Sequence, residues 1–383
     1  MGIAELTRNA VDVLPKGGLE EKLKLGRPLR VKLGIDPTAP DIHLGFAVVL
    51  RRLAAFQAAG HQAILIVGDY TARIGDPSGL VEERPVLPPE VLDANAKLFA
   101  EQAYRILDRD RTEVRFNGEW LAALGYEEIV KLARTITVAR LLERDDFSGR
   151  FERHEPISLS ELLYPVMQAY DSIAVRADVE LGGNDQYWNL LTGRDVMQRY
   201  DLEPQVVLTV PLLVGTDGKE KMSKSKGNYI GIAEPPEEQF GKLMSIPDDA
   251  LDQFWRLCLD AEPPETEAME SKLELARRIV ALYHGEETAG RAEEHFTRLV
   301  REHRPPDDVP EAPLPSGDPL HLPAVLAEAF ELASTSEARR LIQQGGVRVD
   351  GDVVDELDLP RERLDGALVQ AGKRRYVRLR APA

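Results

Sequence analysis

Apolar residues form two kinds of pattern along the first half of the chain. Residues 29–35 and 63–67 are short apolar runs, whereas residues 42–59 repeat apolar side chains at near-helical spacing up to Gly60. An uninterrupted aliphatic run is typical of a strand buried on both faces. The order strand, helix, strand predicts a βαβ unit with a right-handed crossover. Further strands are expected at residues 114–116, 178–181 and 205–210. We therefore predict an α/β fold built on a doubly wound parallel sheet.

The pattern changes after residue 232. Residues 235–303 are mostly helical in character, most clearly over residues 271–283 and 288–301. Residues 304–323 then contain seven prolines, and proline lacks the N–H that helices and sheet ladders use. We therefore predict that residues 304–323 are an extended linker without helix or sheet pairing, and that a domain boundary lies there.

The C-terminal part of the chain has the pattern of a small α+β domain. Helices are expected at residues 324–332 and 338–344, the second opened by the capping-box pattern Ser334-Thr335-Ser336-Glu337. The dipeptide Asp350-Gly351 favours a tight hairpin turn with positive φ. Residues 375–379 are expected to form the closing strand.

The composition is that of a globular protein. Of 383 residues, 43% are hydrophobic and 30% are charged, which separates the chain from disordered proteins. The apolar runs are too short to cross a bilayer, and the first residues lack the apolar stretch of a signal peptide. Cys258 is the only cysteine, so an intramolecular disulfide and a cysteine-built zinc site are excluded. We expect a cytoplasmic protein without a membrane partner.

The charge is unevenly distributed along the chain. The formal net charge is −17, which argues against broad, nonspecific binding to nucleic acid. Residues 334–383 nevertheless hold 10 Lys or Arg against 8 Asp or Glu, and five of these cations lie in residues 373–380. The distribution indicates an acidic body with a small basic appendage, although a solvated charged strand has the same composition.

Two polar segments have the chemistry of a phosphate site. Asp36-Pro37-Thr38-Ala39-Pro40-Asp41-Ile42-His43-Leu44-Gly45 joins the first predicted strand to the first long helix. Ligands of doubly wound sheets bind there, and helix N–H groups attract phosphate. Lys219-Glu220-Lys221-Met222-Ser223-Lys224-Ser225-Lys226-Gly227-Asn228 places four lysines among serines and a glycine, which suits a loop that closes over a polyphosphate. Taken alone, the first segment is at least as well explained by a structural histidine, and the second is better explained by a solvated lysine-rich turn.

Together the two segments resemble the signatures of class I aminoacyl-tRNA synthetases. His43-Leu44-Gly45 resembles the first signature, and Lys221-Met222-Ser223-Lys224-Ser225 resembles the second. Segments similar to those of bacterial-type tyrosyl-tRNA synthetases lie at residues 34–39, 74–79, 164–171 and 182–186. The C-terminal part is similar to the S-four type of RNA-binding domain, which favours tyrosyl-tRNA synthetases over the related tryptophanyl-tRNA synthetases, the near alternative.

The resemblance implies several parts in sequence order. These are a Rossmann-like catalytic domain at residues 1–232 with a helical insertion at about 118–160, a helical anticodon-side domain at 233–303, the linker at 304–323 and an S-four type RNA-binding domain at 324–383. The resemblance also implies a homodimer that uses tRNA(Tyr), L-tyrosine and ATP. Mg²⁺ is expected to arrive with ATP, because no dedicated carboxylate cage is visible in the sequence.

The resemblance also assigns roles to individual residues. Catalytic contacts are assigned to Thr38, His43, Lys221 and Lys224. ATP binding is assigned to Asp36, Thr38, His43, Gly45, Phe46, Gly182, Asp185, Lys221, Met222 and Lys224. Tyrosine binding is assigned to Gly34, Thr71, Asp76, Tyr164, Gln168, Asp171 and Gln186. Binding of tRNA is assigned to Arg339, Arg340, Arg348, Lys373, Arg374, Arg375 and Arg378.

The amino-acid pocket carries the clearest chemical expectation. The spacing of Tyr164, Gln168 and Asp171 places them on one face of a helix, with Pro165 suited to its first turn. By resemblance, Tyr164, Gln168 and Asp76 hold the substrate ammonium group, and Asp171 accepts a hydrogen bond from the phenol. Phenylalanine would leave that buried carboxylate unpaired, which predicts strong rejection of phenylalanine.

Two positions depart from the family pattern. Phe46 stands where the first signature usually ends in a second histidine. A phenyl ring donates no hydrogen bond, and losing a neutral bond of ~1–2 kcal/mol slows activation about tenfold. We expect an active enzyme in which Phe46 packs near the adenosine; the alternative is a non-catalytic RNA-binding paralogue. Lys32 stands where many members have a tyrosine that contacts the phenol, which leaves open whether Lys32 faces the phenol or solvent.

Overall fold

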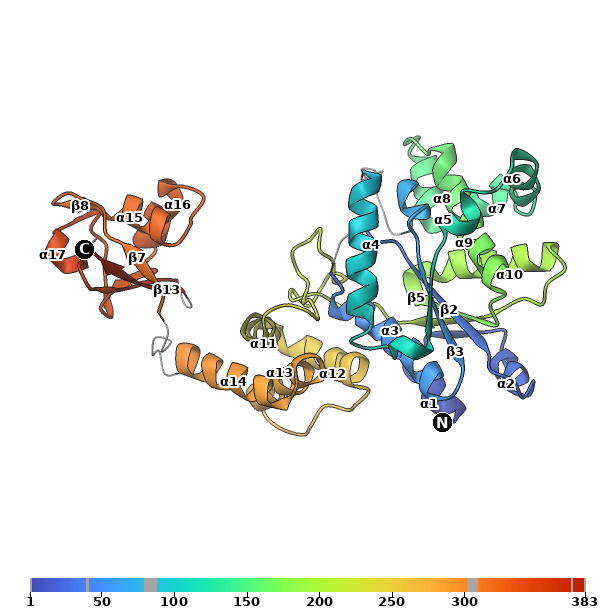
Figure 1. Cartoon of the computed structure of the whole chain (residues 1–383), viewed down its shortest axis with the longest axis horizontal. Helices are drawn as coiled ribbons and strands as arrows, with labels where there is room; N and C mark the ends of the chain where they lie inside the picture. Colours follow the sequence, from blue (N-terminus) through green and yellow to red (C-terminus); the bar gives the residue numbers. More distant parts are fainter. Residues whose placement is uncertain (1, 39–40, 79–87, 302–308, 373–374, 382–383) are drawn as a thin grey trace. The chain divides into compact units, whose positions relative to one another are not determined.

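The computed structural model of the chain describes residues 2–38, 41–78, 88–301, 309–372 and 375–381. Its internal contacts divide it into two compact units, Met1–Gly285 and Glu286–Ala383, and Figure 1 shows the elements of each. No helix within these described ranges is long and apolar enough to span a bilayer.

The first unit is built on a six-stranded sheet with the order β1-β6-β5-β2-β3-β4. Its strands are β1 (Asp12–Leu14), β2 (Arg30–Ile35), β3 (Gln62–Val67), β4 (Thr112–Phe116), β5 (Val179–Gly183) and β6 (Val206–Val210). The strands from β6 to β4 run parallel, and β1 pairs antiparallel with β6 at the edge. The doubly wound α/β prediction is confirmed. The edge strand β1 was missed because three residues are too few to show a periodicity.

Helices pack on both faces of this sheet (Figure 1). The helices of the first unit up to β6 are α1 (Ile3–Leu6), α2 (Gly18–Leu23), α3 (Leu44–Ala58), α4 (Pro89–Ala103), α5 (Gly118–Leu121), α6 (Tyr126–Ala133), α7 (Val138–Leu142), α8 (Asp145–Glu152), α9 (Leu159–Val175) and α10 (Tyr187–Arg199). After β6 come α11 (Pro236–Ser245), α12 (Leu251–Leu259) and α13 (Ala268–His284). Helix α3 contacts β2, β3 and β5. Arg30 and Lys32 of β2 contact α9, so alternation along β2 leaves Val31 and Leu33 for the opposite face.

Helix α9 corrects one expectation from the sequence. Its first residue is Leu159, and Ser158 and Glu161 form the capping box that opens it. Pro165 therefore lies inside the helix, and the prediction that it occupies the first turn is wrong. The capping signal at Ser158 was available in the sequence and outweighs the preference of proline for a helix start.

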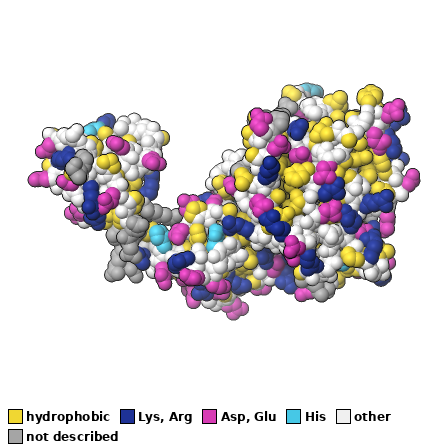
Figure 2. Space-filling view, viewed as in Figure 1, with side chains coloured by type: hydrophobic (Ala, Val, Ile, Leu, Met, Phe, Trp, Pro, Cys, Tyr) yellow, Lys and Arg dark blue, Asp and Glu magenta, His cyan; other side chains and the backbone are white. Residues whose placement is uncertain are grey.

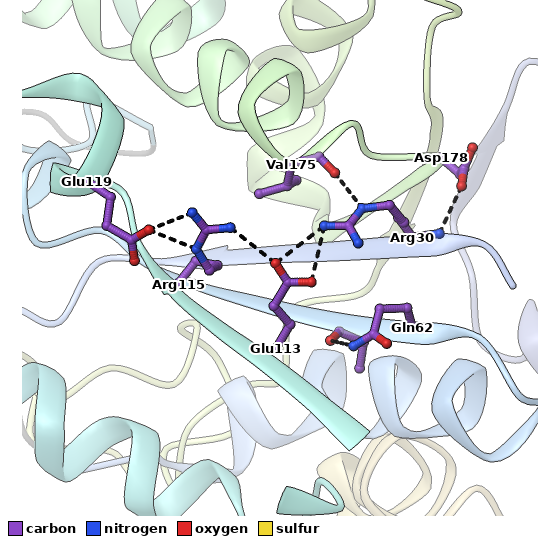
Figure 3. Close-up of polar contacts among 8 residues, drawn as sticks. Arg30, Gln62, Glu113, Arg115, Glu119, Val175 and Asp178 are labelled. Atoms are coloured by element: carbon purple, nitrogen blue, oxygen red, sulfur yellow. Dashed lines mark hydrogen bonds and ion pairs between the residues drawn. The ribbon is translucent and has the colours of Figure 1, made fainter. Parts of the chain in front are cut away.

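A chain of charged side chains fixes the end of α9 to the sheet. Arg30 Nε donates to the carbonyl of Val175 at 2.6 Å, and its guanidinium lies 3.1 Å from the Glu113 carboxylate (Figure 3). Glu113 also pairs with Arg115 at 3.2 Å. The last carbonyls of a helix need such donors. Arg30 therefore ties the helix to β2 and, through Glu113, to β4.

The second unit contains a small sheet covered by helices. Its helices are α14 (Glu286–Phe296), the π-helical turn η5 (Thr297–Arg301), α15 (Leu322–Ala329), α16 (Thr335–Gln343) and α17 (Arg361–Leu364). Its strands are β7 (Glu311–Pro313), β8 (Leu320–His321), β9 (Val347–Val349), β10 (Asp352–Val353), β11 (Asp358–Leu359), β12 (Leu368–Ala371) and β13 (Arg375–Arg380). The main sheet has the order β10-β9-β12-β13-β7. Asp350 and Gly351 have φ of 50° and 94°, which confirms the hairpin between β9 and β10.

The described part of the predicted linker contains β7, β8 and the start of α15, and its residues 304–308 lie outside the described residues. Within residues 304–323, β7 pairs in parallel with β13, so the expectation of no sheet pairing is wrong. Ala312, Leu314 and Leu320 belong to the buried core of the second unit. Proline is compatible with an edge strand, where its missing N–H need not serve a ladder, and β7 is such an edge.

Candidate active site

The carboxyl ends of the parallel strands bring the predicted amino-acid residues together. Gly34 lies near the end of β2, Thr71 follows β3 in the short helix η1 (Thr71–Arg73), and Gln186 follows β5 in η3 (Asn184–Gln186). Parallel strands end at the same edge of a sheet, where ligands bind. A Cβ at Gly34 would meet no atom within 4 Å, so there is open space beside β2 at this edge.

The half-buried Asp36 joins Thr71 to Tyr164, another residue predicted to bind the amino acid. Asp36 accepts a hydrogen bond from Thr71 Oγ1 at 2.7 Å and from the hydroxyl of Tyr164 at 3.0 Å. Burial raises the pKa of Asp36 to about 7; the Thr71 bond opposes that rise and the charge of Asp76 adds to it. Asp36 was expected on the nucleotide side, yet the structure bonds it to Thr71 and Tyr164, which were expected on the amino-acid side.

Asp171 is held by two donors that the sequence did not reveal. Asp171 is 3% exposed, and its carboxylate accepts from Trp120 Nε1 at 2.8 Å and from Asn117 Nδ2 at 3.3 Å. Burial raises the pKa of Asp171 to about 6, against the opposing charge of Lys32 and both hydrogen bonds. Asn117 and Trp120 directly follow β4, so the same strand-end rule that pointed to Thr71 was the available signal.

A second polar group surrounds Asp76. Gln186 Nε2 donates to Asp76 Oδ2 at 2.7 Å, and Asn189 Nδ2 donates to Gln186 Oε1 at 3.0 Å. The backbone N–H of Ser78 donates to Asp76 Oδ1 at 2.9 Å. Asn189 was missed because it lies in the first turn of α10, after the segment 182–186 that resembles the family. The carboxylate of Asp76 is thus held by Gln186, from the segment between β5 and α10, and by a backbone N–H of its own loop.

Lys32 is buried, and the suggestion that it faces solvent is wrong. The side chain is 0% exposed, and its Nζ lies 2.8 Å from Glu180 Oε1. It also donates to Ser172 Oγ at 2.8 Å and to the carbonyl of Gln168 at 3.2 Å. Glu180, on β5, is a further residue that the sequence analysis did not single out.

The start of α3 lies at the same edge of the sheet, and we call the region around His43 and Phe46 the nucleotide mouth. His43 is the N-cap residue of α3 and is 6% exposed, and its ring stacks on Phe46 with 4.5 Å between centroids. Burial lowers the pKa of His43 to about 4, and the charge of Lys224 lowers it further. The imidazole is therefore neutral near pH 7. A Cβ at Gly45 would lie 3.0 Å from ring atoms of His43, so glycine allows the ring to lie against the helix start.

The lysine-rich segment contacts this mouth. Lys224 Nζ lies 3.0 Å from Asp41 Oδ2, and Lys221 Nζ lies 3.2 Å from Asp185 Oδ2. Met222 is buried, and its Cβ lies 3.6 Å from the position of a Cβ at Gly45. The two segments singled out in the sequence therefore meet, with Asp41 as a partner that was not predicted.

Other predicted nucleotide residues also lie along this edge. A Cβ at Gly183 would come within 2.7 Å of Asp185 Oδ1, and one at Gly182 would lie 3.1 Å from Gln186 Cβ. Gly183 thus allows the Asp185 carboxylate to lie against the backbone, and Gly182 allows Gln186 to do so. Thr38 is exposed at the end of a described range, and residues 39–40 of the first segment lie outside the described residues.

The predicted RNA-binding arginines of the second unit lie on two faces. Alternation along β9 and β13 directs Arg348 and Arg378 away from the face where the apolar strand residues meet α15 and α16. Arg339 and Arg340 are exposed on α16. Arg375 is exposed at the start of β13, and Lys373 and Arg374 lie outside the described residues.

Comparison with known families agrees with this arrangement. Residues 24–301 match the family model described as tRNA synthetases class I (W and Y). The chain belongs to this family. Residues 322–359 match the model of the S4 domain. This class I synthetase therefore carries a C-terminal S4 domain, as its sequence indicated.

Individual relatives of the class I synthetase cover almost its whole length. It is 47% identical to a tyrosine–tRNA ligase of Thermotoga maritima over 98% of the chain and 96% of the relative. It is also 47% identical to one of Ralstonia nicotianae over 98% of the chain and 99% of the relative. Its fold is similar to that of a tyrosyl-tRNA synthetase from Archaeoglobus fulgidus solved with L-tyrosine, with a TM-score of 0.62 and 24% identity over 76% of this chain and 98% of that one.

Proposed function

We propose that the chain is a tyrosine–tRNA ligase that activates L-tyrosine with ATP and transfers the tyrosyl group to the 3′ end of tRNA(Tyr). The observation that carries this proposal is the meeting of the two signature segments beside a pocket that contains a buried Asp171. The full-length similarity to tyrosine–tRNA ligases supports it. Tyrosyl-adenylate forms when the substrate carboxylate attacks the α-phosphorus of ATP and pyrophosphate leaves, without a covalent enzyme intermediate.

The amino-acid pocket selects tyrosine through fixed polar partners. Asp171 accepts from the substrate phenol while Trp120 and Asn117 hold the carboxylate in place. Tyr164, Gln168 and Asp76 receive the ammonium group, Gly34 and Thr71 line the pocket beside them, and Gln186 reaches towards the substrate carboxylate. Tryptophan has an indole N–H that can also donate to Asp171, so discrimination against tryptophan rests on the shape of the pocket.

The nucleotide mouth stabilises charge on the triphosphate. Thr38 and His43 contact the β,γ-phosphates, and Lys221 and Lys224 exchange their carboxylate partners for phosphate oxygens as charge builds on the leaving pyrophosphate. Asp185, released from Lys221, accepts from the ribose hydroxyls. Gly45, Phe46, Gly182 and Met222 complete the walls of this site. Asp36 borders it from the amino-acid pocket, where it accepts from Thr71 and Tyr164. The substrate supplies the nucleophile, so these residues act through position and charge.

Mg²⁺ enters this site bound to ATP. The carboxylates at the mouth, Asp41 and Asp185, pair with lysines, so we assign the ligands of the metal to phosphate oxygens and water. When bound, Mg²⁺ neutralises part of the negative charge of the triphosphate.

Phe46 does not argue for a non-catalytic protein. Its ring stacks on His43 and lies edge-on to Phe99, with 6.1 Å between centroids. It therefore packs the start of α3 and shields the neutral imidazole. Both lysines of the second signature, Lys221 and Lys224, are present, and so are all the residues assigned to the amino-acid pocket. These residues favour an active enzyme over an RNA-binding paralogue.

The C-terminal domain contributes the contact with tRNA. Arg339, Arg340, Arg348, Lys373, Arg374, Arg375 and Arg378 are the proposed phosphate contacts. Recognition of this kind depends on phosphate charge and RNA shape. Removing residues 322–383 should spare adenylate formation and largely abolish charging of tRNA. Equal charging by the shortened chain would refute this role.

We propose a homodimer whose interface includes the insertion between β4 and α9. Tyr126, Val138, Phe151 and Leu159 are large apolar side chains that are 57% to 81% exposed, and hydrophobic atoms gather on the visible face of the first unit (Figure 2). Several such residues in one region are typical of an interface. Light scattering should give the mass of a dimer, and Phe151→Glu with Leu159→Glu should give that of a monomer.

The decisive experiment is ATP–pyrophosphate exchange by the full chain with single amino acids. Tyrosine should support exchange, whereas tryptophan and phenylalanine should not at equal concentration. Exchange that requires tryptophan would assign the other member of the family. Absence of exchange with every amino acid, together with retained binding of tRNA, would establish the non-catalytic alternative.

A further inference from the structure

A buried ion pair lies between the sheet and α9. Lys32 of β2 and Glu180 of β5 are directly opposite each other in the parallel register, with 2.8 Å between Nζ and Oε1. The side chains are 0% and 1% exposed. Removing two charges from water is unfavourable, and an apolar pair of similar volume is often as stable or more stable. Stability alone is therefore a weak reason for this pair.

All three donors of Lys32 are engaged within the protein. An ammonium group has three N–H bonds, and Lys32 contacts Glu180, Ser172 Oγ and the carbonyl of Gln168. The substrate phenol therefore has Asp171 as its partner, and Lys32 acts on α9 instead. Two of its three contacts are residues of that helix.

Glu180 fixes the orientation of the Gln168 amide. Gln168 Nε2 donates to Glu180 Oε1 at 3.3 Å. A carboxylate only accepts, so it selects the amide rotamer that presents NH₂ to it and turns the amide oxygen away. Gln168 Oε1 is buried and has no hydrogen-bond partner among the described residues. A buried acceptor without a donor is unfavourable, and a ligand with N–H groups supplies what is missing.

We propose that Glu180, with Lys32 as its counter-ion, is a positioning residue that directs the amide oxygen of Gln168 at the ammonium group of the substrate. This inference rests on the proposed function, which assigns the ammonium group to Gln168. Ser172 connects the same parts, because its Oγ lies 2.8 Å from Lys32 Nζ and 3.2 Å from Glu180 Oε2. The pair thus sets both the rotamer of Gln168 and the position of α9 on the sheet.

The test compares two double variants of the full chain. Lys32→Met/Glu180→Met removes the acceptor beside Gln168 together with both charges, so the fold keeps an apolar pair of similar length. Its KM for tyrosine should rise about tenfold or more, with kcat for pyrophosphate exchange within about threefold, because one hydrogen bond from a charged donor is weakened. Lys32→Met/Glu180→Gln keeps an oxygen for Gln168 Nε2 and should restore most of the affinity.

Two substrate analogues separate positioning from general loosening. Tyrosinol has the ammonium group and 3-(4-hydroxyphenyl)propionic acid lacks it; both are measured by calorimetry. The first double variant should lose about tenfold in affinity for tyrosinol and at most about twofold for the acid. Arg150→Met/Glu161→Gln is the control, since it removes another buried ion pair, which joins α8 to α9, and it should leave the ratio of the two affinities unchanged.

The outcomes are distinguishable. Unchanged affinity for tyrosinol in the folded variant, or an equal loss for both analogues, would overturn the positioning role. If the methionine pair does not fold, Lys32→Met/Glu180→Leu is measured in the same way. Failure of the unmodified chain to exchange pyrophosphate with tyrosine would instead overturn the proposed function, because that measurement contains no variant.

Discussion

The amino-acid pocket and the nucleotide mouth of the first unit are built in opposite ways. In the pocket, Asp171 and the Lys32–Glu180 pair are at most 3% exposed and are bonded to side chains from several elements. At the mouth, the side chains of Lys221 and Lys224 are 36% and 19% exposed, and each pairs with a carboxylate of another segment. Under the proposed function, the polar partners of the pocket are in place before substrate arrives, whereas the lysines exchange their carboxylate partners for phosphate oxygens.

The difference corresponds to two chemical tasks. Choosing one amino acid requires buried partners whose positions do not adapt to the wrong substrate. Stabilising a leaving pyrophosphate requires cations that approach as charge develops and withdraw afterwards. Substitutions in the pocket should therefore change which amino acid is used, and substitutions at the mouth should change the rate of activation.

The largest effect is expected from Asp171→Asn, which tests whether the pocket depends on a fixed carboxylate. The variant loses the charged acceptor for the phenol. The substrate phenol and the indole N–H of Trp120 must then compete for the single amide oxygen of the asparagine. We expect kcat/KM for tyrosine to fall about 10³-fold, or ~4 kcal/mol. Pyrophosphate exchange with tyrosine and phenylalanine measures it. The surface variant Asp110→Asn is the control, and retention of tyrosine preference by Asp171→Asn would contradict the pocket assignment.

Lys221→Ala and Lys224→Ala test the other half of the comparison. Each removes one cation from the leaving pyrophosphate and should lower the rate of adenylate formation about 10²-fold. Binding of tyrosine should not change, because neither lysine contacts the pocket. Lys226→Ala is the matched control from the same loop, since this lysine pairs with Glu220. A main effect on KM for tyrosine would show that the two regions are not separate.

The pH dependence of tyrosine binding should be intermediate in size. The pKa of Asp36 is about 7 in the free pocket, and a bound ammonium group favours the ionised carboxylate. KM for tyrosine should therefore rise about tenfold when the pH falls from 8 to 6. The raised pKa of Asp36 also lowers the stability of the unliganded protein as pH rises from about 4 to 7. Over this range the folded state keeps a proton on Asp36 that the unfolded chain releases.

A matched variant isolates the contribution of Asp36. Asp36→Asn cannot titrate, so its KM for tyrosine should vary less between pH 6 and 8 than that of the unmodified chain. Steady-state exchange at several pH values measures both. An identical profile in the two proteins would assign the titration to another group.

The smallest effect is expected from Phe46→His. The histidine restores a donor near the nucleotide, worth ~1–2 kcal/mol, and should raise the activation rate by about tenfold at most. Rapid-quench measurement of adenylate formation tests this. An increase above about a thousandfold would mean that the mouth of this chain is impaired, and would favour the non-catalytic alternative.

Much of this molecule could be predicted from local patterns. The apolar runs located β2 and β3, and the residue pair Asp350-Gly351 located a hairpin. Local patterns were less informative where other parts of the chain determine which element a segment forms. Residues 304–323 have the composition of a linker, yet β7 pairs with β13. Pro165 is a typical residue of a helix start, yet the capping box at Ser158 begins α9 earlier.

The sequence by itself determined the alternation of strands and helices, the order of the two signature segments and the side chains available at the strand ends. These are local properties, because periodicity and motif chemistry need only neighbouring residues. The tertiary structure alone decided the partners. Whether Lys32 met solvent, the phenol or Glu180 depended on which strand lies beside β2 and which helix covers it. Burial and charge pairing arise from the packing of distant segments, and no single segment of the sequence contains them.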